Sequence, residues 1–192
     1  MSITKLTTNG LTGTKYDIAS ADNYYMEPIA TTLISSATGT VTFSNIPQGY
    51  KHLQVRTLTR SASGGAAFGG TQLTFNGDTT TSNYTFHRLI GDGSSASAYG
   101  QSGLDYIIRT ALSGLAASIY AVSVIDILDY SNVYKFKTTR CLTGGDNNST
   151  VGIVGLFSQL WMNTAPITSM TFTPSSTNFD VNSRFSLYGV KA

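Results

Sequence analysis

The stretch GTVTFSNIPQGYKHLQVR, residues 39–56, contains two short runs in which apolar and polar residues alternate. Val41 and Phe43 alternate with threonines in the first run, and Leu53 and Val55 alternate with polar residues in the second. Successive side chains of a β-strand point to opposite faces, so this period of two predicts half-buried antiparallel strands. Pro47 and Gly49 between the runs favour a turn.

The same pattern continues along most of the chain, with turn signals such as Asn76-Gly77 and the loop at residues 144–149 between the runs. Expected strands are residues 29–34, 39–43, 52–60, 72–75, 84–90, 106–110, 119–128, 133–141, 150–160, 167–173 and 184–190. This number of short strands predicts an all-β fold, an antiparallel β-sandwich of the jelly-roll kind. The best candidate for a helix is residues 103–117, where several apolar residues fall near helical spacing.

Residues 1–26 differ from the remainder, because they show no sustained period. We interpret them as an extended N-terminal arm for attachment or oligomerisation, with residues 27–192 as the β-sandwich domain. An equally weighted alternative is a frayed tail followed by one edge strand. The apolar side chains of the arm are interface candidates: Tyr16, Tyr24, Tyr25 and Met26.

The composition is neutral and rich in hydroxyl groups, with 23 Ser and 28 Thr among 192 residues and only 11% charged residues. A net charge of +2 without a basic run argues against a nucleic-acid partner. No signal peptide and no membrane-spanning run is evident, so synthesis in a host cytoplasm is expected. Cys141 is the only cysteine, which excludes an intrachain disulfide, and we interpret it as a small buried hydrophobe.

We expect no catalytic residue, metal or cofactor. His52 and His87 are the only histidines, and no cluster has metal-ligand spacing. Asp126 and Asp129 are the closest approach to the paired carboxylates of a glycosidase, but they mark the end of a strand. The acidic loop residues, including Asp92, are interpreted as turn residues rather than calcium ligands.

The aromatic residues offer candidates for contacts with other molecules. Trp161 and Met162 end an apolar run, which predicts either a central strand or a strand with one face against a partner subunit. Tyr99 and the loop residues Asp146, Asn147 and Asn148 are candidates for contact with a partner or a sugar.

Several motifs together resemble a family of bacteriophage virion proteins. Residues 43–53 are similar to a motif in which a strand ends at Ile-Pro and the next opens with His-Leu. Other segments are similar to further parts of the same family, in the expected order. They are residues 27–30, residues 74–78 with 83–84 and 89–93, and residues 185–191. The resemblance implies a β-sandwich found in phage decoration and tail-fibre proteins, and it implies no catalytic residues.

The first hypothesis is therefore a non-enzymatic capsid decoration or cement protein, located in the virion and bound to the major capsid protein or a tail component. A homo-oligomer is expected, with a trimer as the first guess. The alternative is a tail-fibre or receptor-binding domain that recognises host surface glycans. A lectin-like cellular module and a small hydrolase are weaker alternatives. No membrane partner is expected.

Overall fold

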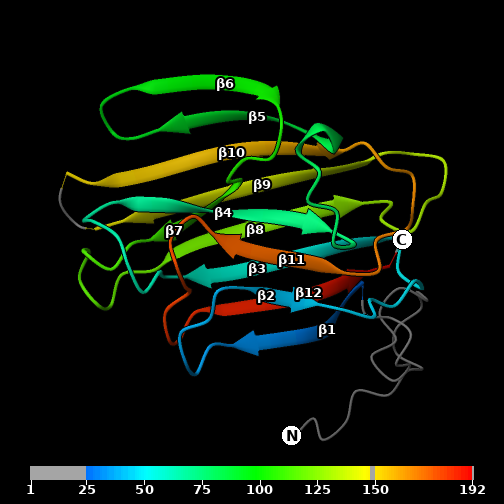
Figure 1. Cartoon of the computed structure of the whole chain (residues 1–192), viewed down its shortest axis with the longest axis horizontal. Helices are drawn as coiled ribbons and strands as arrows, with labels where there is room; N and C mark the ends of the chain where they lie inside the picture. The colour runs from blue at the N-terminus through cyan, green and yellow to red at the C-terminus, as the bar shows by residue number, and fades with distance from the viewer. Residues whose placement is uncertain (1–24, 148–149, 192) are drawn as a thin grey trace, which may run out of the picture.

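The computed structural model describes residues 25–147 and 150–191, which form two antiparallel sheets packed face to face (Figure 1). The large sheet contains, in spatial order, β1 (Met26–Leu33), β12 (Arg184–Val190), β3 (His52–Thr59), β8 (Ala121–Leu128), β9 (Lys137–Asp146), β10 (Gly152–Trp161), β5 (Tyr84–Gly91) and β6 (Ala96–Ser102). The small sheet contains β2 (Val41–Phe43), β11 (Met170–Pro174), β4 (Phe68–Phe75) and β7 (Ile108–Ala111). A short 3-10 turn, η2 (Thr81–Asn83), precedes β5. The predicted all-β, jelly-roll-like sandwich is thus confirmed.

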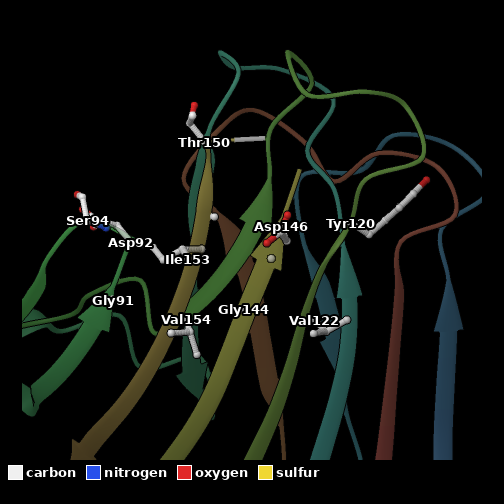
Figure 2. Close-up of a pocket in the computed structure, with 13 residues that line it drawn as sticks. Gly91, Asp92, Ser94, Tyr120, Val122, Gly144, Asp146, Thr150, Ile153 and Val154 are labelled. Carbon is white, nitrogen blue, oxygen red and sulfur yellow. The ribbon is translucent and has the colours of Figure 1, made fainter. Parts of the chain in front are cut away.

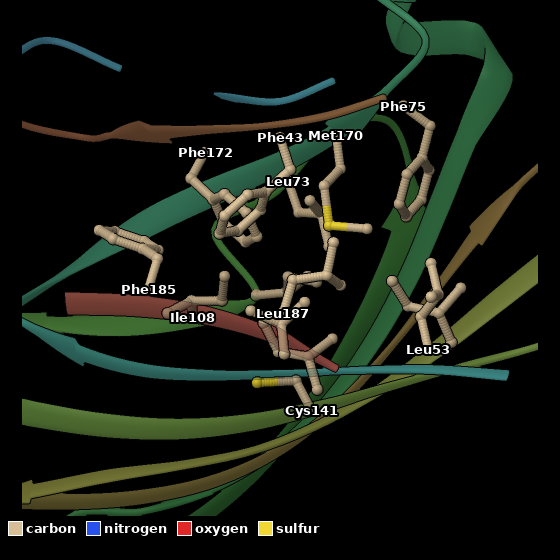
Figure 3. Close-up of a cluster of buried hydrophobic side chains, with 14 of the residues drawn as sticks. Phe43, Leu53, Leu73, Phe75, Ile108, Cys141, Met170, Phe172, Phe185 and Leu187 are labelled. Atoms are coloured by element: carbon tan, nitrogen blue, oxygen red, sulfur yellow. The ribbon is translucent and has the colours of Figure 1, made fainter. Parts of the chain in front are cut away.

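The core lies between the two sheets and follows from the alternation seen in the sequence. Leu53 and Val55 of β3 point inward and are buried, as predicted. Aromatic rings fill much of the interior (Figure 3): the ring centroid of Phe185 lies 5.1 Å from that of Phe172 and 4.9 Å from that of Phe179. Each fully buried Phe side chain contributes about 2 to 3 kcal/mol of hydrophobic stabilisation.

Most strands lie close to the predicted runs, but β6 was not predicted. Its sequence, Ala-Ser-Ala-Tyr-Gly-Gln-Ser, is composed mainly of residues with weak β-propensity. It forms a strand because it pairs antiparallel with β5, from Gly91 opposite Ala96 to Thr85 opposite Ser102. Hairpin pairing therefore overrides local preference here.

The helix considered for residues 103–117 is wrong, because this segment contains β7 and no helix. Gly103 has a left-handed φ of 125°, which breaks a helix at its first residue. β7 pairs with β4, from Phe68 opposite Ala111 to Thr71 opposite Ile108. The apolar residues at near-helical spacing are drawn into this pairing and into the core instead.

The predicted strand at residues 133–141 also needs a correction, because β9 begins only at Lys137. Tyr134 and Phe136, which precede the strand, are 87% and 52% exposed, whereas Lys137 is fully buried. The Lys137 ammonium donates hydrogen bonds to the carbonyls of Asn132 (2.6 Å), Lys135 (2.8 Å) and Thr164 (3.0 Å). Three acceptors satisfy the buried cation, so the first residue of β9 can point into the core.

The Asn76-Gly77 turn is confirmed, but it does not form a hairpin. Both residues have left-handed φ angles, 51° and 71°, and the Asp78 amide donates to the Phe75 carbonyl at 2.8 Å. The turn connects strands of different sheets, because β4 lies in the small sheet and β5 lies in the large sheet. The turn therefore carries the chain across the sandwich.

Candidate functional site

A row of exposed apolar side chains crosses the outer face of the large sheet, the face turned away from the small sheet. Val124 of β8, Leu142 of β9, Leu156 of β10 and Leu89 of β5 lie opposite one another in successive strand pairs. Their exposed fractions range from 37% to 58%. We call these residues the apolar band. Side chains directly opposite on neighbouring strands contact one another, so the band is one continuous surface.

The band exists because the central strands of the large sheet are apolar on both faces. In β8, Ile125 and Ile127 point into the core, while Val122 and Val124 point outward. In β10, Phe157 is buried and Leu156 on the opposite face is 46% exposed. An apolar surface of this continuity on a folded protein is typical of an interaction site.

A polar row lies beside the band on the same face. Asp126 of β8 accepts hydrogen bonds from Gln54 of β3 and from Arg140 of β9, both at 2.9 Å. Arg56 donates to Gln54 at 3.0 Å, and its guanidinium lies 5.4 Å from the centre of the Tyr188 ring. An apolar centre with a hydrogen-bonded polar margin is the usual composition of a protein–protein interface.

A groove of about 860 Å³ opens at one end of this face, beyond the band (Figure 2). Its floor is a second cross-strand row in which Val122, Gly144, Val154 and Gly91 follow one another. The two glycines carry no side chain, so the row is hollow at Gly144 between the valines and again at Gly91 beyond Val154. Tyr120, Asp92 and Asp146 line the groove as well.

The Asp92 carboxylate in this groove is already engaged by its own turn. It accepts hydrogen bonds from the backbone amides of Ser95 (2.8 Å) and Ser94 (2.9 Å). These hydrogen bonds lower the pKa of Asp92 to about 2, so the group is ionised at neutral pH. Asp92 is thus a turn residue, as the sequence indicated.

The predicted interface residues of the arm lie at or before the start of the structure. Tyr16 and Tyr24 fall outside the described residues. Tyr25 is 62% exposed, and its carbonyl accepts the backbone amide of Lys191 at 3.0 Å. Met26, which was assigned to the arm, is the first residue of β1 and pairs with Val190.

Of the two alternatives for the apolar run before Met162, the central strand is confirmed, and contact of one face with a partner stays a prediction. β10 lies between β9 and β5, so the run is a central strand. Trp161 is 1% exposed, and its indole N–H donates to Asp78 at 2.8 Å. As an interface candidate Trp161 is therefore wrong, because core packing covers it, whereas Met162 is 36% exposed.

The predicted loop contacts do not form one site. Tyr99 lies in β6, 49% exposed, with its ring 5.9 Å from that of Phe86. Asp146 ends β9, and β10 and β5 separate that strand from β6. Asn147 accepts the Val151 amide at 3.2 Å and closes its own loop, and Asn148 lies outside the described residues.

The residues considered for catalysis have structural partners. Cys141 is fully buried, which confirms its interpretation as a small buried hydrophobe, and this burial raises the pKa of its thiol to about 12. Asp129 is paired with Lys135 (2.8 Å) and Lys51 (3.1 Å), and these cations lower its pKa to about 2. A carboxyl with so low a pKa is unsuited to act as a general acid. The Nδ1 atom of His52 accepts the Asp129 backbone amide at 3.0 Å.

Residues 25–147 and 150–191 contain no group of three or more His, Cys, Asp or Glu arranged to hold a metal ion. In the same part of the chain, no helix has the length and apolar character needed to cross a membrane.

Comparison with known proteins gives no relative. No protein-family model matches the chain, and no curated protein and no solved structure is significantly similar to it.

Proposed function

We propose that the protein is a non-enzymatic structural subunit of a phage particle, a decoration protein that binds the capsid through the outer face of its large sheet. The observation that carries this proposal is the apolar band, formed by Val124, Leu142, Leu156 and Leu89. The assignment to a phage particle rests on the sequence resemblance at residues 43–53 and the motifs that follow it.

The physical basis is burial of the band against a shell protein. Removing apolar surface from water contributes roughly 25 cal/mol per Å², and the costs of association consume part of that gain. A single contact would be weak. Many copies on a regular shell would each add a contact, and linked contacts raise the overall affinity by orders of magnitude.

Binding to particles that lack the protein tests this proposal. The double variant Leu89→Asp with Leu142→Asp places two carboxylates in the band on strands that are not neighbours, and burial of unpaired charge opposes docking. We expect the fraction that sediments with particles to fall at least about tenfold. Both side chains are about half exposed, so circular dichroism should show an unchanged fold.

The matched control is Thr42→Asp, which adds a carboxylate to the exposed outer face of the small sheet. This variant should bind particles like the wild type. Unchanged binding of the double variant would contradict the proposed docking face. Antibody labelling viewed by electron microscopy tests the location: label over the head is expected, and an absence of label from all particles would contradict a virion role.

The groove favours a second candidate function, recognition of a host surface glycan by a tail component. It has room for a small saccharide, and Tyr120 at its margin offers an aromatic face. Label confined to the tail, together with glycan binding that Tyr120→Ala abolishes, would support this function over capsid decoration.

A further inference from the structure

β6 (Ala96–Ser102) forms an open edge of the large sheet. It is the last strand in the sheet order, and within residues 25–147 and 150–191 no strand pairs with its outer side (Figure 1). All of its residues are exposed. The hydrogen-bonding groups along a free edge are a template for another strand.

The other sheet edges carry features that oppose such pairing, whereas β6 does not. β1 contains Pro28 and an irregular register between Pro28 and Ala30. β2 has 3 residues and β7 has 4, which leaves little length to pair. β6 has 7 residues, with no proline, no charged residue and no bulge. Charged residues, prolines, bulges and short length are the usual protections of an edge strand.

The hydrogen bonds of the hairpin show which backbone groups are directed outward. The Gly103 amide donates to the Tyr84 carbonyl at 2.7 Å, and the Asp92 amide donates to the Ser95 carbonyl at 3.2 Å. Hydrogen-bonded pairs alternate along an antiparallel ladder, so the odd-numbered residues of β6 bond to β5. The even-numbered residues present their N–H and C=O groups to the open edge: Ala96, Ala98, Gly100 and Ser102.

We propose that β6 pairs antiparallel with β6 of a second copy, across a two-fold axis at Tyr99. In this register Ala96 lies opposite Ser102 of the second copy and Ala98 lies opposite Gly100. Every outward-facing residue then has an outward-facing partner, with which it exchanges two hydrogen bonds. A register centred on Ala98 or Gly100 would leave one end of the strand unpaired.

A second copy fits this edge because the strand is complementary to itself. β6 carries no charge, so pairing two identical strands creates no like-charge contact. The residues that meet on the outer face are small, and the two Tyr99 rings, each 49% exposed, meet on the inner face. An isologous contact of this kind closes on itself as a dimer.

The pairing joins two large sheets edge to edge. A two-fold axis normal to the sheet keeps the outer faces on the same side, so both apolar bands would face one surface. The inference goes beyond the proposed function and does not require it, because self-pairing of β6 occurs with or without a capsid partner.

Sedimentation of the purified full-length protein over a concentration series tests the pairing. Ser97 of one copy would lie opposite Gln101 of the other, and both are exposed. In the variant Ser97→Lys with Gln101→Lys, like charges face each other, so the dimer dissociation constant should rise at least about tenfold. In Ser97→Lys with Gln101→Glu, opposite charges face each other, and dimerisation should return.

Two control variants test whether dimerisation depends on β6 and not on another part of the chain. Leu33→Lys adds a charge to β1, where Leu33 is 61% exposed, and should leave the dimer intact. Deletion of residues 2–24 should also leave it intact. The proposal is overturned if the wild type stays monomeric at all concentrations or if the Lys/Lys variant dimerises like the wild type. It is also overturned if the Lys/Glu variant fails to dimerise, or if deletion of residues 2–24 abolishes dimerisation. These measurements use no particles, so their failure is distinct from failure of the capsid proposal.

Discussion

At the scale of single residues, two buried cations organise the loops at the ends of the sandwich. Lys137 is one, and Arg60, which is 4% exposed, is the other. The Arg60 guanidinium donates to four loop carbonyls at 2.8 to 3.1 Å, those of Ser113, Leu115, Ala116 and Ile119. Its Nε atom also lies 3.4 Å from the Asp180 carboxylate. The planar guanidinium of Arg60 can donate to several carbonyls at once, and the single ammonium of a lysine could not replace it.

Asp78 is one carboxyl for which we expect a pH effect on stability, because one of its hydrogen-bond donors, Trp161, is 83 residues away in the sequence. The Trp161 indole N–H and the Asn83 amide donate to its carboxylate at 2.8 Å each, and they hold its pKa at about 2. The pKa in the unfolded chain is about 3.9, so the stabilisation is present above that value and is lost as pH falls toward 2.

The variant Asp78→Asn keeps one acceptor oxygen but does not titrate. Urea unfolding between about pH 5 and pH 2 should therefore show a smaller loss of stability in the variant than in the wild type. Parallel pH curves for the two proteins would contradict the role of the Asp78 charge.

At the scale of elements, the strands at one edge of the large sheet depend on a close contact at Gly189 of β12. A Cβ atom at this position would lie 2.4 Å from carbon atoms of the Tyr50 ring. The Tyr50 hydroxyl donates to Glu27 of β1 at 2.9 Å, and Lys191 donates to the same carboxylate at 2.6 Å. Tyr50 therefore links the turn before β3 to β1 and to the end of β12.

We expect Gly189→Ala to displace the Tyr50 ring and to destabilise the fold by about 1 to 3 kcal/mol, because the site has no room for a methyl group. Urea unfolding measures the change. Gly49→Ala is the matched control: a Cβ atom at Gly49 would have no neighbour within 4 Å, and the free energy of unfolding should change by less than about 0.5 kcal/mol. Equal effects of the two substitutions would refute this explanation.

At the scale of the whole molecule, the two sheets share one core. Trp161 of β10 in the large sheet lies 5.6 Å, ring to ring, from Phe75 of β4 in the small sheet. It is the only tryptophan, so its fluorescence reports directly on the contact between the sheets.

The unfolding transition followed by Trp161 fluorescence should coincide with that followed by far-UV circular dichroism, because neither sheet can bury its inner face without the other. Thermal or urea unfolding at one protein concentration provides both curves. A fluorescence change well before the loss of strand signal would show that the sheets separate first.

The sequence alone established the class of fold and most of its strands. Alternation in β3 and β2 correctly separated the buried Leu53 and Phe43 from their polar neighbours, because the period of two is a local property of a strand. Asn76-Gly77 correctly predicted a turn, because both residues accept a left-handed backbone. The apolar run before Trp161 predicted either a central strand or a strand with one face against a partner, and β10 is a central strand.

Only the tertiary structure decided which strands are neighbours and which faces stay exposed. Leu142 and Leu156 are far from Leu89 in the sequence, and strand order alone brings them into one band. β6 is a strand because of its pairing with β5. Lys137 is buried because three carbonyls surround its ammonium, and one of them, that of Thr164, is 27 residues away in the sequence. Alternation of apolar and polar residues shows that a strand has one buried and one exposed face. The pairing of strands that are distant in the sequence determines which residues lie beside each face.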